Sequence, residues 1–268
     1  MTEYVTTSRG DRVAYDRRGD GPALIFVAGA GPHRATDPVT TATAEAMVPL
    51  GVTTVVFDRL GRGDSPATER LDLDRELAAV AALIDVVGGS AVLCGHSSGC
   101  TIALRAAVGG LPVTGLALWE APIAGDRAAT RDWIDGFLRR LDAGELAAAR
   151  EFYMKDMPPQ WLAEAKRSPE WPELVEQTVS LRADAESLGW AASAPHAELF
   201  AGIDLPVLAM AGTETFDEMI ESAALIAAAV PGARQARVAG AFHSWEPEPM
   251  AAELAGFVHA AATEKAAR

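Results

Sequence analysis

Short runs of apolar residues, bounded by glycine or proline, recur along the chain. A continuous apolar run of about four to six residues is typical of a strand that is covered on both faces, as in a parallel sheet. Ahead of these runs, residues 3–7 and 12–16 predict a hairpin that turns at Gly10-Asp11. The runs that predict covered strands are Ala23–Val27, Thr53–Phe57, Ala91–Cys94, Leu116–Trp119 and Val207–Met210. Gln235–Val238 is predicted as a last short strand.

Segments with helical periodicity separate these strands. Alternation of strands and helices favours an α/β fold with a mostly parallel, doubly wound sheet. In such a sheet, residues at the carboxyl ends of the strands form the edge at which ligands bind. The clearest predicted helices are Leu73–Val87, Ser98–Val108, Phe216–Val230 and Met250–Ala262.

The alternation stops between residues 122 and 195. This stretch has helical periodicity and no convincing strand, and its apolar positions from Trp133 to Leu141 fall on one helical face. We therefore predict a core formed by residues 1–121 and 196–268, with a helical cap inserted at 122–195. Four of the six tryptophans lie in the insert: most are expected to pack its own small core, and one or two could face a pocket between cap and sheet. They are Trp133, Trp161, Trp171 and Trp190.

The charge balance excludes two classes of partner. The 268 residues include 23 basic and 37 acidic side chains, which gives a formal net charge of −14. Binding to nucleic acid or to an anionic membrane surface needs clustered lysine and arginine, so neither is expected. With 49% hydrophobic and 22% charged residues, the composition is that of a globular protein.

The cysteines and the first residues bear on location. Cys94 and Cys100 are the only cysteines, and both lie in apolar surroundings. Neither a disulfide framework nor a zinc site is predicted from them. The first residues show no basic segment followed by an apolar one, as a signal peptide would. We expect buried, reduced cysteines in a cytoplasmic protein, either a monomer or a homodimer.

A nucleophile motif stands between a predicted strand and a predicted helix. Gly95-His-Ser97-Ser-Gly99 has the form G-x-S-x-G, and small residues there let the strand and helix approach closely. The tight turn would expose the hydroxyl of Ser97, and the N–H of Ser98 would face a developing oxyanion. A second N–H is expected from Gly29 or Ala30 in the loop after the first covered strand, unless that loop is a plain tight turn. The same loop lacks the third glycine of a dinucleotide fingerprint.

One of the five histidines is placed to act as the base. His243 follows the last short strand and precedes the final helix, which suits the chain order serine, acid, histidine. His96 lies inside the nucleophile motif and is expected to be structural, and His33 to line the mouth of a pocket. The other two, His196 and His259, are expected at the surface or at helix caps.

Three carboxylates compete for the role of the acid. Its usual position, a few residues past the strand that follows an insert, is occupied here by Thr215, with Glu214 and Asp217 displaced by one or two residues. A shift of one residue along extended chain reverses the direction of a side chain. Glu120 directly follows the strand before the insert, where packing alone explains a charged residue poorly. We favour Glu120 and keep Asp217, Glu214 and the absence of a working acid as alternatives.

These features together resemble the α/β-hydrolase superfamily over essentially the whole chain. The segment Phe57–Ser65 is similar to the superfamily's D-x-x-G-x-G-x-S loop. The elbow, the position of Glu120, the absence of an acid at Thr215 and the Phe242-His243 loop more closely resemble the zearalenone-type lactone hydrolases, in which the acid is a glutamate on the strand before the cap. The resemblance implies an α/β-hydrolase fold, the triad Ser97, Glu120 and His243, and Gly29 and Ser98 as oxyanion donors.

The expected activity is hydrolysis of a carboxylic ester or lactone of an apolar small molecule, without a metal or organic cofactor. Candidate substrate contacts are His33, Trp190 and Phe242. The same triad could also serve C–C bond hydrolysis, acyl transfer, or cofactor-free oxygenase or perhydrolase chemistry. A ligand receptor without turnover is the alternative from another class of protein.

Overall fold

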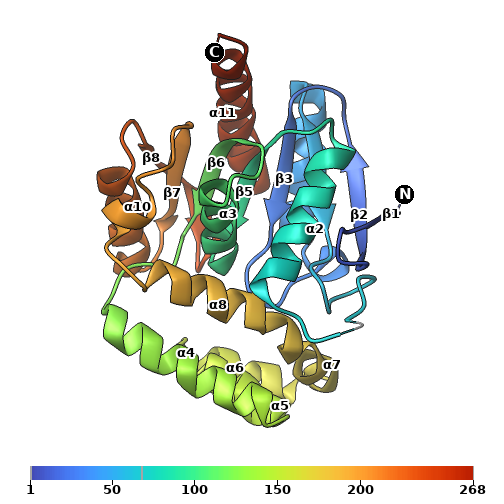
Figure 1. Cartoon of the computed structure of the whole chain (residues 1–268), viewed down its shortest axis with the longest axis vertical. Helices are drawn as coiled ribbons and strands as arrows, with labels where there is room; N and C mark the ends of the chain where they lie inside the picture. The colour runs from blue at the N-terminus through green and yellow to red at the C-terminus, as the bar shows by residue number, and fades with distance from the viewer. Residues whose placement is uncertain (1, 68, 268) are drawn as a thin grey trace.

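A nine-stranded sheet forms the centre of the computed structural model, which describes residues 2–67 and 69–267 (Figure 1). The strand order is β1-β2-β4-β3-β5-β6-β7-β8-β9. Strands β3 to β8 pair in parallel, while β1, β2 and β9 pair antiparallel at the two edges. The strands are β1 (Glu3–Thr6), β2 (Arg12–Arg18), β3 (Ala23–Val27), β4 (Thr53–Phe57), β5 (Ala91–His96), β6 (Val113–Trp119), β7 (Val207–Glu214), β8 (Arg234–Ala241) and β9 (Ser244–Trp245).

Helices cover both faces of the sheet and create two apolar cores. Alternate residues of β3 belong to different cores: Ile25 to the core under α2, α3 and α10, and Phe26 to the core under α1 and α11. This period of two explains why the covered strands read as continuous apolar runs. The helices are α1 (Pro38–Met47), α2 (Leu73–Val86), α3 (Ser98–Val108), α10 (Asp217–Ala229) and α11 (Pro247–Ala267). The predicted mostly parallel, doubly wound sheet is confirmed.

The chain between β6 and β7 is helical, as predicted. Figure 1 shows these helices gathered at one end of the sheet, with α8 between the core and the rest of the group. Helix α8 packs against α2 and α3 on one side and α4 on the other. The predicted cap bounds, 122–195, stay a prediction. The helices are α4 (Arg127–Asp142), α5 (Leu146–Tyr153), α6 (Pro159–Arg167), α7 (Trp171–Glu176), α8 (Leu181–Ala191) and α9 (His196–Leu199).

The cap helices bury a small aromatic core of their own. Trp133 stacks on Phe137 with ring centroids 6.0 Å apart, and the rings of Trp133 and Tyr153 meet edge to face with centroids 5.0 Å apart. Ala30, from the loop after β3, packs against this cluster. The cap core therefore touches the same loop that the sequence assigns to the oxyanion hole.

Two elements were not predicted from sequence. Strand β9 has only two residues, too few for a pattern. Helix α1 is rich in threonine and alanine, but its start carries a recognisable signal, because the Asp37 carboxylate accepts the N–H of Thr40 at 2.9 Å and Pro38 occupies the first turn.

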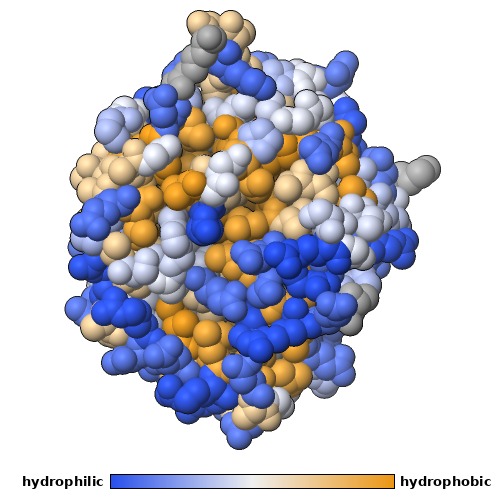
Figure 2. Space-filling view, viewed as in Figure 1, coloured by the Kyte–Doolittle hydropathy of each residue, from blue (hydrophilic) through white to orange (hydrophobic). Residues whose placement is uncertain are grey.

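The surface and the cysteines agree with the composition. Figure 2 shows hydrophilic residues over the cap helices at the bottom of the view, interrupted by hydrophobic patches. Cys94 and Cys100 are buried and free. Within residues 2–67 and 69–267, no helix is both long and apolar enough to cross a membrane.

Candidate active site

The turn from β5 to α3 holds Ser97 in a strained conformation. Its backbone has φ 53° and ψ −128°, a region that L-residues seldom occupy. A Cβ on Gly95 would lie 2.5 Å from the Cα of Cys100, and one on Gly99 would lie 2.0 Å from the carbonyl oxygen of Val27. Only glycine therefore lets strand and helix come this close. Ser97 remains partly exposed, whereas the next residue, Ser98, is buried.

The register of the sheet places Glu120 beside the elbow. His96, the last residue of β5, pairs with Trp119, the last residue of β6, so Ser97 and Glu120 are the first residues beyond two neighbouring strand ends. The N–H of Ser97 donates to the carbonyl oxygen of Trp119 at 2.9 Å. The N–H of Glu120 donates to the carbonyl oxygen of Met210 on β7 at 2.9 Å.

The carboxylate of Glu120 is fully buried and meets the imidazole of His243. Its Oε2 lies 2.5 Å from Nδ1 of His243, and its Oε1 accepts the N–H of Gly212 at 2.9 Å. A Cβ on Gly212 would lie 3.1 Å from Oε1, so a small residue makes room for the carboxylate. Burial raises the pKa of Glu120, but the hydrogen bonds with His243 and Gly212 outweigh it and lower the pKa overall. The group is thus held ionised.

The loop from β8 to β9 fixes the backbone of His243. Its carbonyl oxygen accepts hydrogen bonds from Nε2 of His96 at 3.0 Å and from Nε1 of Trp119 at 3.3 Å. Because Nδ1 faces Glu120, the proton belongs on Nδ1, and Nε2 keeps the free electron pair that a base needs. The side chain is 21% exposed and so remains reachable from solvent.

Backbone strain marks the same residues independently of any motif. Among residues 2–67 and 69–267, positive φ outside glycine occurs at Ser97 (53°), Glu120 (49°), Phe242 (51°) and His243 (71°). Each such residue costs free energy and persists only where its surroundings impose it, so strained residues cluster at functional sites. Three of these four residues are the predicted nucleophile, acid and base.

The predicted oxyanion donors lie next to the elbow. A Cβ on Gly29 would lie 2.9 Å from the Cβ of Ser97, so the loop after β3 passes directly against the nucleophile. Ala30 follows it under the cap core, and Ser98 begins α3. The loop after β3 and the start of α3 therefore both adjoin Ser97, and the assignment of their N–H groups as oxyanion donors stays a prediction.

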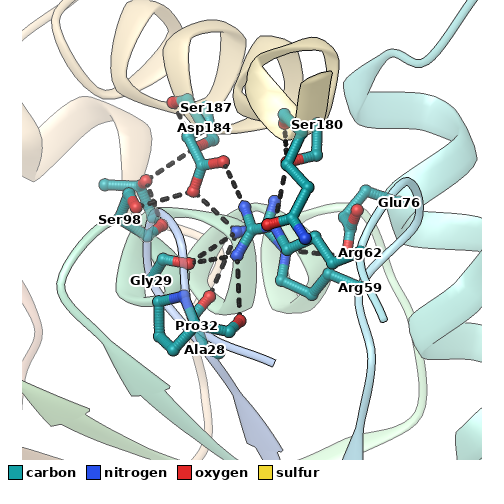
Figure 3. A network of polar contacts seen from close by, with 12 residues as sticks. Ala28, Gly29, Pro32, Arg59, Arg62, Glu76, Ser98, Ser180, Asp184 and Ser187 are labelled. Carbon is teal, nitrogen blue, oxygen red and sulfur yellow. Dashed lines mark hydrogen bonds and ion pairs between the residues drawn. The ribbon is translucent and has the colours of Figure 1, made fainter. Parts of the chain in front are cut away.

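Sequence reasoning missed a buried ionic cluster behind this loop. Asp184 of α8 and the arginines Arg59 and Arg62, from the loop between β4 and α2, are at most 1% exposed. Figure 3 shows Asp184 between Ser98 on one side and the two arginines on the other. The arginines stand in the glycine loop that resembles the superfamily motif, which was a usable signal. Asp184 stands in an ordinary amphipathic helix, and nothing in its sequence surroundings distinguishes it.

The structure treats the three predicted substrate contacts differently. His33 lies at the seam between core and cap, with Nε2 4.0 Å from a carboxylate oxygen of Glu173 on α7. Phe242 adjoins His243 and is 79% exposed, so it projects into solvent. Trp190 packs against Phe200, with ring centroids 6.0 Å apart, and the guanidinium of Arg105 lies 5.9 Å from its ring centroid, so its predicted contact with substrate stays a prediction. Arg105 stands near the end of α3 far from Ser97, and Trp190 packs against the core on that side.

The remaining candidates are peripheral. Glu214 and Asp217 are both exposed, Glu214 at the end of β7 and Asp217 at the start of α10. His196 stacks on Phe200 with ring centroids 5.4 Å apart, and exposed His259 bonds the carbonyl oxygen of Leu50 at 2.9 Å. Of the carboxylates considered, Glu120 is the one that the structure brings to His243.

The chain belongs to the α/β-hydrolase family, whose model matches residues 24–257. Comparison with curated proteins gives no significant match. Among solved structures, it is 31% identical to an α/β hydrolase from Sphaerobacter thermophilus DSM 20745, with a TM-score of 0.79 over 95% of this chain and 99% of that one.

More distant structures share the fold. A thermophilic esterase from Thermogutta terrifontis is 18% identical, with a TM-score of 0.66 over 98% of each chain. The enol-lactonase from Burkholderia xenovorans LB400 is 16% identical, with a TM-score of 0.60 over 97% of this chain and 100% of that one. At these identities, the likeness concerns the fold.

Stability toward acid is expected to depend on His96. Burial, aided by the neighbouring His243, lowers the pKa of His96 to about 3, against about 6.5 when unfolded. Between these values the unfolded chain binds one more proton, so this stabilisation is complete above pH 6.5 and falls by about 1.4 kcal/mol per pH unit toward pH 3. Urea unfolding at pH 6.5, 5.5 and 4.5 gives the free energy of unfolding at each pH. Plotted against pH, this free energy should rise less steeply for His96→Gln than for wild type, by the amount that one proton contributes.

The exposed His259 supplies the matched control for this experiment. His259→Gln makes the same chemical change on α11 and should keep the wild-type slope. Equal slopes for His96→Gln and wild type would show that His96 is protonated in the folded protein.

Proposed function

We propose that this chain is a serine hydrolase that cleaves a carboxylic ester or lactone of an apolar small molecule. The contact that carries the proposal is the 2.5 Å approach of the buried Glu120 carboxylate to Nδ1 of His243. A buried carboxylate in this position orients the ring and stabilises its cation while Nε2 takes a proton. The strained elbow supplies the hydroxyl that gives up that proton.

The first half of the reaction forms an acyl-enzyme. Nε2 of His243 removes the proton of Ser97 as Oγ attacks the carbonyl carbon, and the carbonyl electron pair moves to oxygen. N–H groups of Ser98 and of Gly29 or Ala30 stabilise that oxyanion, and one such donor is typically worth about 10²–10³ in rate. When the intermediate collapses, the ester C–O bond breaks and the leaving oxygen takes the proton from His243.

The second half releases the acid. Water gives a proton to Nε2 of His243 and attacks the acyl carbon, and collapse of the second tetrahedral intermediate returns that proton to Oγ of Ser97. For an ester, an alcohol and an acid leave separately. For a lactone, both groups stay on one molecule, and the product is a single hydroxy acid.

Two observations support an apolar substrate. The cap places an aromatic core, which includes Trp133, Phe137 and Tyr153, against Ala30 of the oxyanion loop. The turn at Ser97 and the loop after β3 also contain several small residues, among them Gly95, Gly99 and Gly29. The esterase and enol-lactonase structures with the same fold, and the resemblance of the Glu120 position to zearalenone-type lactone hydrolases, favour ester and lactone chemistry.

The test is covalent labelling with a fluorophosphonate, followed by rapid mixing with a p-nitrophenyl ester. We expect one phosphonyl group per chain, on the peptide that contains Ser97, and a burst of one nitrophenol per chain. Ser193→Ala, which removes an exposed serine after α8, should label like wild type. Inertness toward both reagents would favour the alternative of a receptor without turnover.

A further inference from the structure

A cap aspartate is bound into the backbone around Ser97. Asp184 of α8 is fully buried, and the reaction described above makes no use of it. Its Oδ1 accepts the hydroxyl of Ser98 at 2.7 Å and Nη1 of Arg59 at 2.6 Å, while its Oδ2 accepts Nη2 of Arg62 at 3.0 Å. One carboxylate of the cap therefore holds the residue after the nucleophile and two cations of the core.

The two arginines extend this contact to the other side of the oxyanion hole. Nη1 of Arg62 donates to the carbonyl oxygen of Gly29 at 2.5 Å. Nη1 of Arg59 donates to the carbonyl oxygens of Ala28 at 3.1 Å and Gly29 at 3.3 Å. Figure 3 shows these carbonyl oxygens converging on the guanidinium groups beneath Asp184.

Planar peptides turn these contacts into a constraint on the donors. In a trans peptide the C=O and the following N–H point in opposite directions. A guanidinium that fixes the carbonyl of Ala28 therefore fixes the N–H of Gly29, and one that fixes the carbonyl of Gly29 fixes the N–H of Ala30. The arginines hold the carbonyl oxygen of each of these two peptide groups. The N–H groups of Gly29 and Ala30 therefore point away from the arginines.

We propose that Asp184 is a positioning residue that couples the seating of the cap to the geometry of the oxyanion hole, resting on the proposed function. It holds one donor directly, through the side chain of Ser98, and the other through the arginines bonded to Gly29. When α8 packs against the core, the N–H groups on both sides of the oxyanion hole are held in position. Without its carboxylate, the arginines lose the anion that draws them together behind the loop.

The charges inside the cluster show why a neutral side chain would not serve. Two guanidinium groups and the carboxylates of Asp184 and Glu76 form a buried set with no net charge. Burial and repulsion by Arg59 lower the pKa of Arg62 to about 10, whereas the two arginines hold the pKa of Asp184 below its usual value despite its burial. With Asp184 neutralised, the arginines would repel each other, and the carbonyl of Gly29 would move with them.

The test compares Asp184→Asn with Glu186→Gln. Glu186 lies two residues along α8 and also joins cap to core, because its carboxylate accepts the N–H of Leu73 on α2 at 2.8 Å. We expect Asp184→Asn to lower kcat on a p-nitrophenyl ester by about 10–10²-fold with KM changed less than threefold, since the oxyanion forms only as the reaction proceeds. Glu186→Gln should keep the wild-type kcat.

A spectroscopic measurement separates positioning from stability. Fluorophosphonate leaves a P=O group in the oxyanion hole, and its ³¹P shift reports the hydrogen bonds that it accepts. The shift of labelled Asp184→Asn should move toward that of the unfolded adduct, and the shift of labelled Glu186→Gln should not. If Asp184→Asn folds poorly, Ser98→Ala replaces it as the test, because it removes one contact of Asp184 and leaves both of its arginine pairs in place. We expect it to lower kcat by about 3–10-fold.

Two results would overturn the proposal. One is a folded Asp184→Asn with wild-type kcat and ³¹P shift, or, where it does not fold, a Ser98→Ala with wild-type kcat. The other is a rise in KM alone, which would mean that Asp184 only seats the cap. A wild-type protein that neither labels nor turns over ester would contradict the proposed function itself, and the role of Asp184 with it.

Discussion

Ser97→Ala is expected to lower kcat on an activated ester by about 10⁶-fold. Removing the nucleophile of a serine triad abolishes the acyl-enzyme route, and losses of that order follow in other hydrolases of this type. Alanine fits without strain on its neighbours, since the contacts of the elbow are made by backbone and glycine. The melting temperature should therefore not fall, and the measurement is kcat beside thermal unfolding of the same preparation.

The control for Ser97→Ala is Ser193→Ala, purified in parallel. It should keep wild-type kcat and bind one fluorophosphonate, whereas Ser97→Ala should bind none. If Ser97→Ala turned the ester over as fast as Ser193→Ala, the activity would belong to a contaminant or to another residue.

Glu120→Gln is expected to lower kcat by about 10³–10⁴-fold. A glutamine keeps the size of the side chain and can still accept the N–H of Gly212, but its amide cannot stabilise the histidine cation and favours the wrong tautomer of His243. KM should change little, because the carboxylate acts on the transition state rather than on bound substrate. Steady-state kinetics from pH 6 to 9 would measure both constants.

The two rival acids are tested by replacing each carboxylate with its amide, as in Glu120→Gln. The variants are Asp217→Asn and Glu214→Gln. Both side chains are exposed, so their neutralisation should leave kcat within about twofold of wild type. An undiminished kcat in Glu120→Gln, or a large loss in either rival variant, would refute the assignment of the acid.

Sequence patterns located the sheet well because its strands are covered on both faces. Ala23–Val27 and Thr53–Phe57 have the predicted bounds, since every residue in them is buried. Strands β7 and β8 extend further than predicted, because small residues follow the predicted apolar part: Ala211 and Gly212 in β7, before the exposed Thr213 and Glu214, and 239–241 in β8. Helix α1 escaped prediction because threonine and alanine replace the larger apolar residues that make periodicity visible.

The candidate site was accessible to sequence reasoning where it depends on strand ends. Ser97 and Glu120 each stand one residue beyond a strand that the pattern identifies, and neighbouring parallel strands end at one edge. Asp184 stands on a cap helix whose orientation no local pattern encodes. Its partners Arg59 and Arg62 are more than 100 residues away in sequence, so only the folded chain brings them together.

The positive φ angles at Ser97, Glu120 and His243 create a trade-off between thermal stability and activity. Each position holds a residue whose conformation glycine would adopt freely, at a relief of about 1 kcal/mol per site. A population selected only for survival at high temperature would therefore collect glycine or asparagine at these three positions and lose turnover as it gained stability. Phe242 is the exception, because its strain can be relieved without removing any of the three reactive groups, and directed evolution toward a robust enzyme would begin there.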